Sequence, residues 1–95
     1  MNTEALAKAS KLIAARNVNS RVKSVKVGWD AVTSKLTVAY YIDREPSEEE
    51  IELCELSMGE LLAEFPEVIT ADTKCVDALA DDDSIVLPGV VYTRD

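Results

Sequence analysis

The clearest hydrophobic pattern in this chain is an alternation of period two over residues 36–42, which predicts a β-strand. Pro46 then stops extended pairing, and Ser47 begins a helix. Ser47 and Glu50 have the spacing of a capping box, in which the hydroxyl and the carboxylate bind each other's backbone amides. The segment therefore predicts a strand that runs into an acidic helix. The alternating residues are Leu36, Val38, Tyr40 and Ile42 on one side and Thr37, Ala39, Tyr41 and Asp43 on the other.

A first helix is predicted at the start of the chain, where apolar residues recur at helical spacing. Asn2 or Thr3 can cap its amino end, because both side chains accept hydrogen bonds from free backbone amides. Asn17 is expected to end the helix in a left-handed conformation. Its many alanines predict close packing on a neighbouring element.

The second predicted helix runs from Ser47 to about Phe65, because a residue before proline is disfavoured in the α region. Its glutamates fall largely off the apolar stripe. Gly59 within it costs about 1 kcal/mol relative to alanine, which suggests close approach of the first helix or of the sheet.

Three further segments predict strands. Residues 25–29 should pair with residues 36–42 through a connection of four to six residues. Residues 69–77 predict a third strand. Pro88 cannot donate to a central ladder, so either residues 90–93 alone form the fourth strand or the whole segment around Pro88 is an edge strand. Helices should cover the apolar face of the hairpin, and the opposite face, with Tyr41, should stay hydrated.

The element order α-β-β-α-β-β predicts an α+β fold. We expect a four-stranded antiparallel sheet with the two helices packed on one face. With 95 residues, the chain should form one domain, residues 1–95, around one modest core.

Charge divides the chain into two unlike parts. Up to Ile42 it has seven basic and two acidic residues, a balance of +5, and from Asp43 onward it has three basic and sixteen acidic residues, a balance of −13. A negative surface repels nucleic acids and membranes, and it attracts basic proteins. Acidity that serves only solubility is the alternative explanation.

The residues offer little for catalysis. The chain has no histidine, the usual general base and a common metal ligand. Cys54 and Cys75 do not form a CxxC motif and are expected to be reduced core residues. The acidic run 81–83 lacks the spacing of a calcium loop. We therefore expect no enzyme, no cofactor and no metal site.

The sequence also bears on where the protein is located and on whether it binds membranes or nucleic acids. The longest apolar runs are only a few residues, so no membrane span is expected. The start of the chain lacks a basic region followed by an apolar run, which favours a cytoplasmic, bacterial-type protein. The basic first part lacks interleaved exposed aromatic residues, so nucleic-acid binding is not expected.

Three motifs carry a resemblance to a known family. They are the run from Tyr40 to Glu49, the run from Glu64 to Pro66 and the run from Gly89 to Arg94. Together they resemble the small bacterial immunity proteins encoded beside contact-dependent growth inhibition toxins and similar polymorphic toxins. The resemblance implies a stoichiometric inhibitor that binds a toxin's C-terminal domain, often an RNase. It implies no catalytic residues.

The acidic part of the chain is the predicted docking surface for such a toxin. Charge would speed capture, and a few buried anchors would slow release. Tyr41 is the expected aromatic anchor, because it lies on the predicted hydrated face. The chain is expected to be a monomer when free. The predicted toxin-binding residues are Tyr41, Asp43, Glu45, Glu48, Glu49, Glu52, Asp81, Asp82 and Asp83.

Two other functions stay open. An acidic secretion chaperone or adaptor would hold a client protein in apolar grooves and would usually be a dimer, which light scattering would detect. A small enzyme or ligand-binding domain would need an apolar pocket with perturbed titratable groups.

Overall fold

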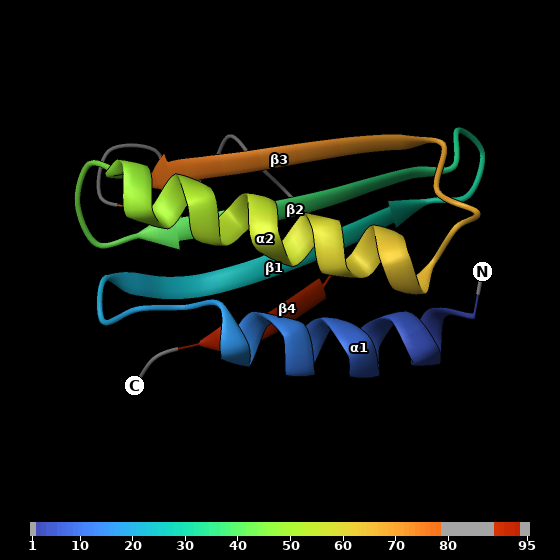
Figure 1. Ribbon diagram of the computed structural model, residues 1–95, viewed down its shortest axis with the longest axis horizontal. Coiled ribbons are helices and arrows are strands. Elements are labelled where there is room, and N and C mark those ends of the chain that lie inside the picture. Colours follow the sequence, from blue (N-terminus) through green and yellow to red (C-terminus); the bar gives the residue numbers. More distant parts are fainter. Residues whose placement is uncertain (1, 79–88, 94–95) are drawn as a thin grey trace.

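The computed structural model describes residues 2–78 and 89–93, the last five by backbone only. Its elements lie in one layer of sheet and one layer of helices (Figure 1). In chain order they are α1 (Thr3–Arg16), β1 (Val22–Asp30), β2 (Lys35–Ile42), α2 (Glu48–Glu64), β3 (Thr70–Asp77) and β4 (Gly89–Thr93).

The sheet is mixed, with the strand order β3-β2-β1-β4. β1 pairs with β2 and with β4 in antiparallel fashion, whereas β2 and β3 are parallel. The prediction of an antiparallel sheet is therefore wrong. The physical reason is α2, which crosses from the end of β2 back to its beginning, so that Thr70 pairs beside Lys35.

The hairpin between β1 and β2 has the predicted short connection, residues 31–34. Ser34 has a positive φ of 52°, the left-handed conformation that reverses the chain. Its carbonyl oxygen accepts hydrogen bonds from the amides of Ile69 and Thr70, at 2.9 and 3.2 Å. The turn therefore also fixes where β3 begins.

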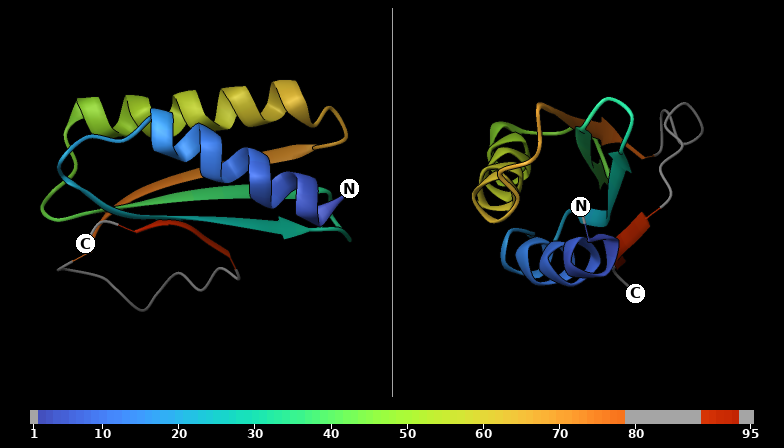
Figure 2. Two further views of the ribbon diagram at one scale, coloured as in Figure 1. Left: turned by 90° about the horizontal axis from the view of Figure 1, so that it is seen from below. Right: turned by 90° about the vertical axis from the view of Figure 1, so that its right-hand side faces the viewer.

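Both helices lie on the same face of the sheet and run antiparallel to each other (Figures 1 and 2). The core fills the space between them and the sheet. The central strand β2 contributes Leu36, Val38, Tyr40 and Ile42 to it, and all four side chains are fully buried. The largest fully buried side chains include Tyr40, Leu36, Ile42 and Leu61.

The helix ends show which local predictions are correct. The Asn2 side chain caps α1 by accepting from the amides of Glu4 and Ala5. The capping box of α2 is confirmed, and Glu50 Oε1 lies 2.9 Å from the amide nitrogen of Ser47. Asn17 does end α1, but its φ of −121° is not left-handed, so that part of the prediction is wrong.

The sheet face opposite the helices is less hydrated than expected. Thr37, Ala39 and Tyr41 on this face are all buried, with Tyr41 only 5% exposed. Lys26 Nζ lies 5.0 Å from the centroid of the Tyr41 ring, on the same face. Because β2 has a strand on each side, its neighbours cover side chains that an edge strand would leave exposed.

Gly59 does not mark a close approach within the fold. It is exposed in the middle of α2, and a Cβ atom placed there would meet nothing within 4 Å. The expectation that Gly59 allows α1 or the sheet to come near is therefore wrong.

Candidate functional site

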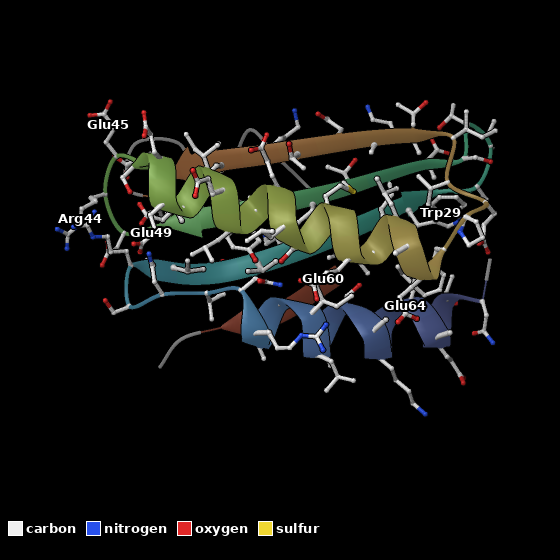
Figure 3. The ribbon with its side chains drawn as sticks, viewed as in Figure 1. Trp29, Arg44, Glu45, Glu49, Glu60 and Glu64 are labelled. Carbon is white, nitrogen blue, oxygen red and sulfur yellow. The ribbon has the colours of Figure 1, made fainter. Side chains whose placement is uncertain are left out.

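The predicted docking residues that the structure describes lie where β2 passes into α2. Asp43 and Glu45 are in the connecting loop, and Glu48, Glu49 and Glu52 are in the first turns of the helix. Figure 3 shows Glu45 and Glu49 at this end of the molecule, with Arg44 projecting outward from the loop that joins β2 to α2. The other predicted residues, 81–83, lie outside the described residues.

α2 is acidic along its whole length. It contains seven glutamates and no basic residue, so no residue of the helix offsets the negative charge in its last turn. Glutamates in the first turn are favoured by the helix dipole, but those near the carboxyl end are not. The helix therefore presents negative charge beyond what its own stability requires.

Some of these carboxylates already have partners within the fold. Arg44 Nε lies 3.1 Å from an oxygen of Asp43. The Asn19 side chain donates to a carboxylate oxygen of Glu49, which ties the loop before β1 to the start of α2. Asp43 and Glu49 are therefore weaker attractors for a partner than sequence reasoning implied. Among the described residues, no ion pair or hydrogen bond engages the side chains of Glu45, Glu48, Glu52, Glu55 and Glu64.

Glu50 belongs to the fold and not to the surface. Its side chain is fully buried, and its Oε2 accepts a hydrogen bond of 2.7 Å from Asn19. Burial raises its pKa, but hydrogen bonds from Ser47 and Asn19 and the charge of Arg21 outweigh burial and lower the pKa below 4.5. The carboxylate is therefore kept ionised in the interior, where it fixes the start of α2.

A second polar group joins α1, α2 and β2. The Tyr40 hydroxyl donates to the carbonyl oxygen of Asn17 at 2.7 Å and lies 2.6 Å from Ser57 Oγ, which must then be the donor. Asn17 in turn donates to Glu60 Oε2 at 2.6 Å, and Arg16 pairs with Oε1 of the same carboxylate.

The pKa values in this group follow from its bonds. Burial raises the pKa of Tyr40 to about 12. The hydrogen bond from Asn17 lowers the pKa of Glu60, and the bond and charge of Arg16 add to that effect against burial. Neither group is set up to exchange protons near neutral pH, so the group serves to lock α1 onto α2.

Further along α2, a shallow depression that sequence reasoning missed opens on the outward face. Leu56 on its wall is 56% exposed, and Gly59 lies in its middle. The signal in the sequence was available: an apolar residue and a glycine at helical spacing on the acidic side. The lining residues are Glu52, Glu55, Leu56, Gly59, Glu60 and Ala63.

Tyr41 does not lie with these residues. Its side chain is buried against the opposite face of the sheet, so it does not offer a free aromatic surface in this conformation. Its role in toxin binding stays an untested prediction.

The two cysteines have no features of a reactive site. Cys54 and Cys75 are free thiols, and Cys54 Sγ donates to the carbonyl oxygen of Lys74 at 3.6 Å. Burial raises the pKa of Cys54 to about 12 and that of Cys75 to about 11. Both therefore stay protonated at neutral pH. Within residues 2–78, no group of three metal-binding side chains occurs, and neither described helix is long and apolar enough to cross a membrane.

Comparison with known proteins gives one result that bears on function. Residues 13–95, most of the chain, match the family model described as MafI2 immunity protein. A search of curated proteins found no match. The match confirms the resemblance to an immunity protein family that the sequence motifs indicated.

Proposed function

The chain belongs to the MafI2 immunity protein family, and we propose that it neutralises a cognate toxin by binding its toxic domain one to one. An immunity protein has a toxin as its partner. The single observation that carries the binding mode is α2, which has seven glutamates, no basic residue and several carboxylates without a partner in the described structure. Such a surface suits a basic protein.

The finer features of this function are also proposals. The toxin domain is a basic nuclease that acts on RNA, and the chain covers its substrate-binding surface. The complex forms in the bacterial cytoplasm, and the free chain is a monomer. Negative charge on the nuclease inhibitor would mimic the phosphates of the substrate and would speed association.

The docking surface centres on the amino-terminal half of α2 and the loop before it. Glu45, Glu48 and Glu52 are its main charged groups, because they are exposed and make no ion pair among the described residues. Asp43 and Glu49 contribute less, since Arg44 and Asn19 already engage them.

The test is the association rate with the toxin domain encoded beside this chain, purified as a catalytically inactive variant. The double variant Glu48→Lys, Glu52→Lys should associate at least tenfold more slowly at low salt and should show a flatter salt dependence. Glu4→Lys with Glu67→Lys is the matched control, because it changes the net charge equally at exposed positions outside this surface. Equal rates for both double variants would place the interface elsewhere.

A further inference from the structure

The middle of the outward face of α2 has no role within the fold. Leu56, 56% exposed, and Ala63 make an apolar hollow around Gly59 that is open to solvent. An exposed leucine alone would need no explanation. Here Leu56 lies beside a glycine and carboxylates without ion pairs, and that combination does need an explanation.

Gly59 is not required by the conformation or the packing of the chain. Its φ is not positive, as it lies inside a regular helix, and an added Cβ would meet nothing within 4 Å. Glycine in a helix interior lowers helix stability relative to alanine. No described residue uses the space over Gly59, so the bare backbone at this position is open to another molecule.

The charges around the hollow define the chemistry of that molecule. Glu52 and Glu55 on the wall have no hydrogen bond or ion pair among the described residues, whereas Glu60 is bound by Arg16 and Asn17. A wholly apolar occupant would cover two carboxylates without satisfying them, which is unfavourable. A wholly basic one would leave Leu56 uncovered.

We infer that this hollow receives an apolar side chain of the toxin domain, with arginine or lysine beside it to pair with Glu52 and Glu55. The inference rests on the proposed function and adds the anchoring position. The apolar side chain sits over the bare backbone at Gly59 and against Leu56. The hollow thus supplies the slow-dissociating contact, and the charged surface at the start of α2 supplies the fast encounter.

The experiment fills the hollow without disturbing the helix. Gly59→Gln replaces glycine with a good helix former whose side chain occupies the space. Ala7→Gln, at an exposed position of α1, is the matched control. Affinity for the inactive toxin domain is measured by titration calorimetry, and folding is followed by thermal melting. We expect Gly59→Gln to melt at or above the wild-type temperature while binding at least tenfold more weakly, mainly through faster dissociation.

A second variant tests the apolar wall. Leu56→Gln removes an exposed apolar side chain, so it should leave the melting temperature unchanged and weaken binding as well. Ala7→Gln should bind within twofold of wild type. If wild type binds and both hollow variants bind within twofold of it, the anchoring position is refuted and the proposed function stands. If wild type does not bind the toxin domain, both proposals are refuted.

Discussion

Tyr40 connects three elements through one hydroxyl group. Its side chain is fully buried on β2, and its oxygen bonds to the end of α1 and to Ser57 of α2. A buried hydroxyl that lost these partners would be costly, and so would partners left without the hydroxyl. The residue is therefore as much a polar connector as a part of the apolar core.

Tyr40→Phe tests this connection. The variant keeps the ring and removes the hydroxyl, which leaves the carbonyl of Asn17 and the hydroxyl of Ser57 without their partner. We expect a loss of about 1–3 kcal/mol in the free energy of unfolding, measured by urea denaturation. The double variant Tyr40→Phe, Ser57→Ala should lose less free energy of unfolding than the sum of the losses in the two single variants. Full additivity would show that the two hydroxyls do not interact.

Glu50 predicts how stability depends on acid. Its pKa is lower in the folded chain than its ordinary value of 4.5, so the unfolded chain binds the proton more readily. Its contribution to stability is therefore complete above about pH 5 and is lost as pH falls through the folded pKa. As pH falls below about 5, wild type should lose stability more steeply than Glu50→Gln, measured by urea denaturation at each pH.

The matched control for this comparison is Glu48→Gln, which removes an exposed carboxylate from the same turn of α2. It should keep the acid dependence that Glu50 contributes. A wild-type curve parallel to that of Glu50→Gln would contradict the assignment of this dependence to the buried carboxylate.

At the scale of the elements, the sequence predicted each helix and strand but not how the strands pair. The bounds expected for α2 and β3 agree with the structure to within one or two residues. The patterns of the two strands nevertheless do not reveal that β2 and β3 are parallel. A helix of 17 residues spans about 25 Å, and a strand of 8 residues spans about 26 Å. The helix is thus long enough to return the chain to the start of β2, where β3 begins and pairs with β2 in parallel.

Burial was harder to predict than the elements. The period-two pattern assigns Tyr41 to one face of β2, but it does not reveal what covers that face. Similarly, the capping motif identifies Ser47 and Glu50, but the burial of Glu50 depends on Asn19, which is 31 residues away in sequence. The candidate site could therefore be assigned to α2 from charge. Its uncharged centre at Leu56 and Gly59 also has a signal in the sequence, but its exposure depends on which face of α2 the fold buries.

Gly59→Ala is the element-scale prediction. The added methyl group meets no other atom within 4 Å and reduces the freedom of the unfolded chain. We expect the free energy of unfolding to rise by about 0.5–1 kcal/mol, measured by urea denaturation. A decrease would show that the backbone at this position is not regular helix in solution.

At the scale of the whole molecule, the net charge is −8, and α2 alone carries seven of the eighteen acidic residues and no basic residue. Glu52 has like-charged neighbours at helical spacing on both sides, Glu48 and Glu49 before it and Glu55 after it. Each such pair opposes helix formation by about 0.2–0.5 kcal/mol. The glutamates of α2 therefore repel one another in the free chain, and a basic partner would relieve this repulsion on binding.

This repulsion predicts that salt stabilises the free chain. Raising the ionic strength from about 0.01 to 0.15 M shortens the screening length from about 30 to 8 Å, so the urea midpoint should increase. Glu52→Gln removes three like-charge pairs at once and should raise the midpoint at low salt and flatten its salt response. Glu67→Gln changes the net charge equally but lies outside the helix, so it should retain the wild-type response. If the urea midpoints of the two variants respond to salt in the same way, the repulsion comes from the net charge of the whole molecule. Binding of a basic toxin would then not relieve a repulsion specific to α2.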